Sequence, residues 1–239
     1  MRPPACHPQT QARKSGSRKG FRLTKWYMDV VSPTGHAAVA YWADLRWGLL
    51  HFAYSGFLES APDHDGRSTS STRRWEPPTF RDGCLTWNAP RLNIRGRWES
   101  AAPPFRCSLL SGPRGDVDWS CIHPRARASV SVGSSTIEGW GYAECLTLSI
   151  RPWRLPIHEL LWGRFLSDDA SIVWIEWRGP EPRVLILHDG REIQGAQIGA
   201  DGLSWPGGRL ALSAGRTLRQ GAIGSTVLAK HGLLRTLTP

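Results

Sequence analysis

Large and small side chains alternate along residues 138–150, and this alternation constrains the fold more than any other feature of the sequence. Trp140, Tyr142, Glu144 and Leu148 fall on one side of a period of two, whereas small residues such as glycine, alanine and threonine fall on the other. Strands have this period and helices do not. Glu144 therefore shares one face of a predicted strand with large aromatic and aliphatic side chains.

A turn and a returning strand are predicted directly after this segment. Pro152 and Pro156 lack the N–H that a strand ladder needs, so pairing should stop there, and residues 158–165 resume a strand pattern. A hairpin closed by this turn places Glu144 opposite Arg164. Its mostly apolar face is either a core with one ion pair or the wall of a binding cavity. A facing arginine would favour the ionised carboxylate and lower the pKa of Glu144.

Short strand patterns separated by turn residues recur along the rest of the chain, beginning at Leu23–Val31, and no stretch of a dozen residues has the pattern of an amphipathic helix. Such a series is typical of all-β antiparallel barrels or sandwiches. The chain has 239 residues, which is long for one eight-stranded barrel. We therefore expect two β-units, over residues 21–115 and 116–239, preceded by a disordered basic tail over residues 1–20.

The composition is rich in tryptophan and in arginine. Thirteen tryptophans suit half-buried strands and the apolar walls of a cavity. The net charge of +10 is scattered outside the first 25 residues, so we do not expect nucleic-acid binding, and the excess of arginine is typical of a high-GC bacterial genome. The basic tail either is simply solvated or makes peripheral contact with an anionic membrane surface.

The five cysteines are an odd number without the CxxC spacing of a zinc site, so neither a metal nor a disulfide framework is expected. Nucleotide-binding glycine motifs and a nucleophile elbow are also absent from the sequence, and we expect no cofactor. No apolar stretch approaches the length of a transmembrane segment. The free thiols and the lack of an apolar signal core favour a cytoplasmic location.

Several motifs resemble one known family. Residues 25–35 (KWYMDVVSPTG) resemble the opening strand of the AttH and carotenoid 1,2-hydratase (hydroxyneurosporene synthase-like) proteins. The run GWGYAE, PWRLP and LWGRF, followed by VWIEWRG and HDG, is similar to a distant branch of that group. The resemblance covers most of residues 23–215 in pattern, with few identical positions.

The resemblance implies two lipocalin-like barrels in tandem around an apolar cavity. Characterised members of the family hydrate or cyclise long isoprenoid or polyketide-like substrates without a redox cofactor. The Gly-Tyr-His-Asp-rich stretch of the carotenoid hydratases is missing, and residues 141–144 (GYAE) stand at about its place. We therefore expect a protein that binds an apolar isoprenoid, carotenoid or lipid-like molecule, either as a cofactor-free hydratase or cyclase or as a non-catalytic carrier. A β-rich interaction protein with a basic tail is the alternative to ligand binding.

Two carboxylates are the candidates for catalysis. Adding water to an alkene, or cyclising a polyene, needs a proton delivered to carbon, and a carboxylic acid kept neutral by apolar surroundings can deliver it. Glu144 fits this role, with contact to a ligand or a structural role as its alternatives. Asp29, on the opening strand, is the second candidate, with a solvated position on the outer face as its alternative. Aromatic faces can stabilise the cation that forms. The predicted ligand-binding residues are Trp26, Trp140, Tyr142, His158, Trp162 and Arg164.

Overall fold

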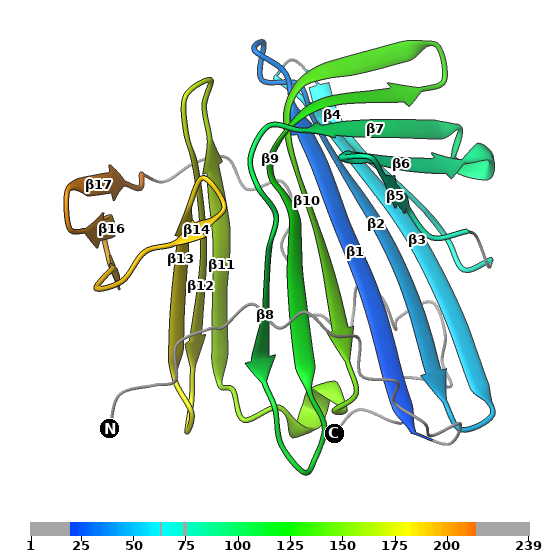
Figure 1. Ribbon diagram of the computed structural model, residues 1–239. Helices are drawn as coiled ribbons and strands as arrows, with labels where there is room; N and C mark the ends of the chain where they lie inside the picture. The colour runs from blue at the N-terminus through cyan, green and yellow to red at the C-terminus, as the bar shows by residue number, and fades with distance from the viewer. Residues whose placement is uncertain (1–19, 63, 74–75, 214–239) are drawn as a thin grey trace.

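The structure, a computed structural model, describes residues 20–62, 64–73 and 76–213 (Figure 1). This part of the chain consists of seventeen strands and two short 3-10 turns, joined into antiparallel sheets. The predicted all-β antiparallel class is therefore confirmed. The basic tail predicted over residues 1–20 lies outside the described residues except for Gly20.

Ten strands form the largest sheet, called sheet A, in the order β4-β3-β2-β1-β10-β9-β7-β6-β5, with β8 also paired to β9. The strands of sheet A are β1 (Phe21–Val31), β2 (Ala37–Trp47), β3 (Leu50–Ala61), β4 (His64–Ser71), β5 (Thr79–Arg81), β6 (Cys84–Ala89), β7 (Ile94–Ser100), β8 (Phe105–Leu110), β9 (Val117–Val132) and β10 (Ser135–Leu148).

Sheet A has two arms, one formed by β1, β2, β3 and β4 and the other by β5, β6 and β7, and strands β9 and β10 join them. Strand β9 is long enough to pair with two neighbours along one edge. Residues 126–132 pair with β7, whereas residues 117–121 pair with β8. The register against β10 shifts between these two parts of β9. Figure 1 shows β6 and β7 running across the direction of β1, β2 and β3. Apolar side chains fill the space between the arms, among them Trp42, Phe57, Trp87 and Trp98.

The second sheet, sheet B, packs on the opposite face of sheet A. Its strands are β11 (Glu159–Leu166), β12 (Ser171–Arg178), β13 (Arg183–His188) and β14 (Arg191–Glu192), paired in that order. A core that includes Trp119, Val173 and Trp177 joins the two sheets. Strand β11 stands at the edge of sheet B.

A small third sheet covers the other face of sheet B. It contains β15 (Gln197–Gly199), β16 (Gly202–Trp205) and β17 (Gly208–Ala211). Ile172, Ile186 and Leu203 form the buried contact between the two sheets. Sheet B is therefore the middle layer at this end of the molecule, as Figure 1 shows.

The predicted boundary between residues 115 and 116 falls inside sheet A rather than between two sheets. Strand β1 pairs along nine residues with β10, so the two predicted units share one continuous ladder. The strand order of sheet A is open at both ends in the described part of the chain. The two tandem barrels stay a prediction.

The hairpin predicted over residues 138–165 is wrong. Strand β10 uses one edge to pair with β1 and the other to pair with β9, so no edge is left for β11. The 3-10 turn Pro152–Arg154 instead carries the chain out of sheet A, and β11 pairs with β12 in sheet B. The prolines do end the strand, as predicted, but they mark a change of sheet.

None of the described residues forms a helix that is long and apolar enough to cross a membrane.

Candidate functional site

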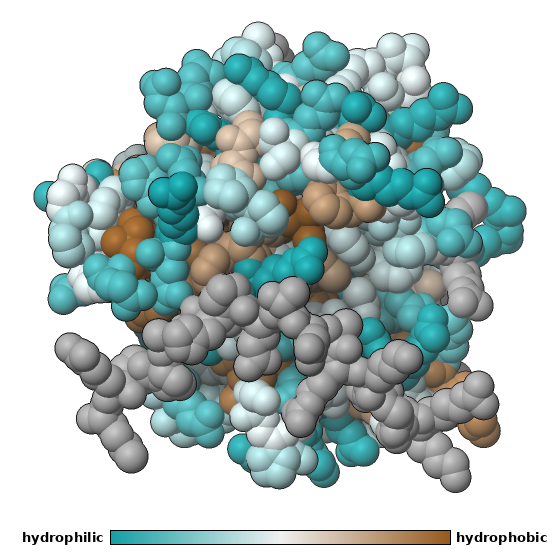
Figure 2. Space-filling model, in the orientation of Figure 1, coloured by the Kyte–Doolittle hydropathy of each residue, from teal (hydrophilic) through white to brown (hydrophobic). Residues whose placement is uncertain are grey.

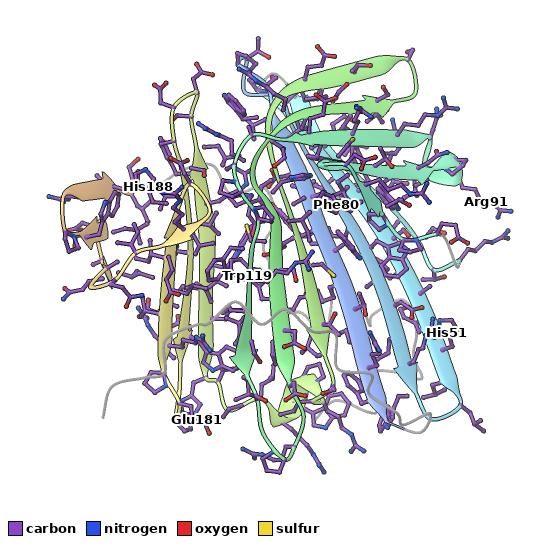
Figure 3. The ribbon with its side chains drawn as sticks, in the orientation of Figure 1. His51, Phe80, Arg91, Trp119, Glu181 and His188 are labelled. Atoms are coloured by element: carbon purple, nitrogen blue, oxygen red, sulfur yellow. The ribbon has the colours of Figure 1, made fainter. Side chains whose placement is uncertain are left out.

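Polar and aromatic side chains meet in the space between sheet A and strand β11, and we call this group the inter-sheet cluster. It takes residues from β1, β9 and β10 of sheet A and from β11 of sheet B. Its members are Tyr27, Asp29, Trp119, Tyr142, Glu144, Trp162 and Arg164. Figure 3 labels Trp119 on β9, where this strand lies near sheet B.

The register of β1 against β10 brings the first of these side chains together. Tyr27 lies directly opposite Glu144, and Asp29 lies directly opposite Tyr142. Directly opposed residues of an antiparallel pair point to the same face, and so do residues two apart on one strand. All four side chains therefore point toward sheet B.

The carboxyl group of Glu144 is held through one of its two oxygens. Trp119 Nε1 donates a hydrogen bond to Glu144 Oε2 at 2.6 Å, and the Tyr142 hydroxyl donates to the same oxygen at 2.7 Å. In the part of the chain that the structure describes, Oε1 accepts no hydrogen bond. Burial raises the pKa of Glu144, although these two donors act in the opposite direction. The surroundings thus favour the neutral acid more than water does.

Asp29 is buried at 1% exposure and makes an ion pair that joins the two sheets at this cluster. Arg164 Nε donates to Asp29 Oδ2 at 2.6 Å, and the backbone N–H of Tyr142 donates to Oδ1 at 3.0 Å. Burial raises the pKa of Asp29, while the Arg164 guanidinium acts to lower it. Both carboxylate oxygens are engaged, so Asp29 fixes its neighbours in place.

The aromatic rings of the cluster pack edge to face. The ring centre of Trp162 lies 4.9 Å from that of Tyr27 and 5.6 Å from that of Tyr142. Tyr41 extends this group, with its ring centre 5.1 Å from that of Tyr27. The indole Nε1 of Trp162 is buried and has no hydrogen-bond partner among the described residues. A buried donor without an acceptor is costly, so this N–H is a candidate for contact with a ligand.

The cluster reaches the surface along the exposed side of β11. Tyr41 is 36% exposed and Leu160, two residues before Trp162 on β11, is 52% exposed. Figure 2 shows apolar side chains gathered near the middle of the face in view, with polar side chains around them. Two open surface hollows of about 390 and 360 Å³ lie elsewhere, beside Trp87 and beside His188.

Five of the eight predicted site residues lie in the inter-sheet cluster: Asp29, Tyr142, Glu144, Trp162 and Arg164. The pairing expected between Glu144 and Arg164 is wrong, because Arg164 binds Asp29 instead. The solvated outer-face position considered for Asp29 is also wrong, since this carboxyl is buried.

The other three predicted residues lie away from the cluster. Trp26 points to the opposite face of sheet A, where it packs on the core between the two arms. Trp140 donates from Nε1 to Asp168 Oδ1 at 2.7 Å, and the Arg127 guanidinium carbon lies 3.7 Å from its ring centre. His158 is exposed. At these positions, the three residues are not placed to contact a ligand bound at the inter-sheet cluster.

Tyr27 and Trp119 are not among the site residues predicted from the sequence. Tyr27 alternates with Asp29 on β1, so the period of two of a strand places both on the same face. Trp119 alternates with Cys121 on β9, and nothing local in the sequence pairs that strand with Glu144. Among the described residues, no group of three or more His, Cys, Asp or Glu side chains is placed to hold a metal ion.

Comparisons with known proteins give no family assignment. No family model matches the sequence, and no curated protein matches it. Among solved structures, an AttH protein from Nitrosomonas europaea is similar over 83% of this chain and 81% of its own, with a TM-score of 0.46 and 10% identity. CghA is similar over 74% of this chain, with a TM-score of 0.43 and 12% identity, and the match spans 61% of its length.

Proposed function

We propose that the protein binds an apolar small molecule, of isoprenoid, carotenoid or lipid type, at the inter-sheet cluster. The rings of Tyr27, Tyr41 and Trp162 offer an aromatic surface beside the exposed side of β11. Ligand sites are typically apolar surfaces with a few placed polar groups. Here Glu144 and the Trp162 N–H are those polar groups.

The observation that carries this proposal is the one-sided hydrogen bonding of Glu144. Because Trp119 and Tyr142 both donate to Oε2, a proton on the acid must reside on Oε1. Burial raises the pKa of this group and so favours the protonated form. The cluster therefore holds a carboxylic acid with a fixed orientation and one oxygen left for a ligand.

Hydration of an alkene is the reaction that such an acid supports. Glu144 would give its Oε1 proton to one alkene carbon, water would bond to the other carbon, and the proton released by that water would return to Glu144. The rings of Tyr142 and Trp162 can stabilise the intermediate cation. Asp29 has both oxygens engaged, so we assign it the role of positioning Tyr142 and Arg164.

Binding without turnover is the second candidate function, and one observation favours it. Both hydrogen bonds to Glu144 Oε2 stabilise the ionised carboxylate, since a carboxylate accepts them more strongly than the neutral acid does. An ionised Glu144 is a poor proton donor and would only anchor the ligand. The protein would then be a carrier.

Native mass spectrometry of the purified protein, with organic extraction of any bound molecule, tests the proposal. A co-purified apolar molecule supports it and supplies the substrate class. Glu144→Gln then separates the two functions, because a catalytic acid is lost while the amide oxygen still accepts from Trp119 and Tyr142. Loss of turnover with retained binding indicates catalysis. Glu138→Gln, an exposed change on the same strand, is the matched control.

Absence of any co-purified molecule, together with no uptake when polyenes and fatty molecules are offered, would contradict the proposal. The interaction-protein interpretation would then be favoured.

A further inference from the structure

Two side chains on the inner side of β11 carry hydrogen-bond donors that have no acceptor among the described residues. Trp162 Nε1 is buried without a partner, as described above. Arg164 uses Nε to bind Asp29, and in the part of the chain that the structure describes its two Nη groups make no hydrogen bond. The Arg164 side chain keeps 17% of its surface exposed. Within the described residues, both side chains of this strand therefore keep donors without an acceptor.

The side chains that carry these donors lie on one face of β11. Trp162 and Arg164 are two residues apart on β11, so their side chains share a face and leave the backbone roughly 7 Å apart. The guanidinium fork binds carboxylates through two parallel N–H groups, and an indole N–H adds a third donor.

The charge around these donors favours an anion. Arg164 is balanced by Asp29, and exposed Lys25 lies near enough to Glu144 to lower its pKa. When Glu144 is protonated, the two cations outweigh the single charge of Asp29. A carboxylate that bound here would meet a net positive site, and no other ionised acid of the cluster would oppose it.

We propose that the ligand is a long apolar molecule that ends in a carboxylate, with the carboxylate on the Nη groups of Arg164 and on Trp162 Nε1–H. This inference rests on the proposed function, because it uses the same binding site. The apolar chain lies along the rings of Tyr27 and Tyr41. Glu144 is then turned toward the part of the chain near the carboxylate.

The test compares parinaric acid, a fluorescent polyene fatty acid, with its methyl ester at pH 7.5. The ester keeps the carbonyl acceptor and the apolar chain and removes the charge. The acid should bind roughly 10-fold more tightly than the ester, the ratio expected for hydrogen bonds to a charged group. Trp162→Phe should weaken binding of the acid by about 5-fold, as expected for one lost hydrogen bond. Trp174→Phe, on the opposite face of sheet B, is the matched control and should leave both affinities unchanged.

The paired change Asp29→Asn with Arg164→Gln should abolish the preference for the acid while avoiding a single unpaired charge. Equal affinity of the wild-type protein for acid and ester would overturn the carboxylate proposal and leave the proposed function standing. An unchanged affinity of Trp162→Phe for the acid would remove Trp162 from the site and overturn the proposed geometry. Failure of both molecules to bind would instead count against the proposed function itself.

Discussion

Replacing Arg164 by methionine should destabilise the protein strongly, because it leaves Asp29 buried without its counter-ion. Asp29 is 1% exposed, so water cannot replace the lost guanidinium. Breaking a buried ion pair from one side typically costs about 3–5 kcal/mol. The Arg164 side chain keeps 17% exposure, which places the expected loss at the lower end, about 3 kcal/mol.

The loss should also depend on pH. Burial raises the pKa of Asp29, and Arg164 is the main group that opposes this rise. Without Arg164 the pKa of the folded state rises further above that of the unfolded chain. The folded state then binds more protons than the unfolded state, so stability falls as the pH rises. The variant should therefore recover part of its stability as the pH is lowered toward the ordinary range of an aspartate.

Urea unfolding followed by tryptophan fluorescence measures both effects, provided that the slope of the transition is unchanged. The double change Asp29→Asn with Arg164→Met should recover most of the loss, because asparagine still accepts from the Tyr142 N–H. Arg178→Met, at an exposed arginine of β12, is the matched control and should have a much smaller effect. A loss of under 1 kcal/mol in Arg164→Met, or a loss independent of pH, would refute the unpaired-charge argument.

Three further predictions concern other buried groups. Glu144→Gln should reduce the fall in stability with rising pH above the ordinary pKa of glutamate, because the raised pKa of Glu144 makes its ionisation destabilising; urea titrations at several pH values measure this. Gly163→Ala should lower the melting temperature, because the added methyl group meets the ring of Trp174, whereas Gly199→Ala, whose methyl group meets only ordinary contacts, should not. His123 has a pKa lowered to about 4 by burial, so stability should fall as the pH drops from 6.5 toward 4; His123→Phe should abolish this fall, and a persistent fall would locate its cause elsewhere.

The alternation around Glu144 predicted the faces of β10 correctly. Tyr142 and Leu148 belong to the core against sheet B, whereas Ala143 and Cys145 face the core between the two arms of sheet A. Both faces of β10 are covered by other strands, and its sequence therefore alternates between large and small side chains. Such a pattern identifies the faces, but it carries no information about which strand lies next to it.

Long-range pairing is the part that the sequence could not supply. Asp29 and Arg164 are separated by 135 positions, whereas a hairpin, the simplest connection, places the nearby Glu144 opposite Arg164. The polar stretch after Leu58 likewise contains β4 (His64–Ser71), at the edge of sheet A. An edge strand can be polar because little of it needs to be buried, so hydrophobic periodicity does not detect it.

Tyr142 joins the two carboxyl groups into one unit and explains why both belong to the same site. Its backbone N–H donates to Asp29, and its hydroxyl donates to Glu144. The Asp29–Arg164 pair fixes β11 against β1, and this contact in turn holds Trp162 5.6 Å from the Tyr142 ring. The ion pair therefore acts on Glu144 through the position of one tyrosine. Contacts among three strands bring the acid and the side chains of Trp162 and Arg164 together, so the inter-sheet cluster forms only once both sheets have packed.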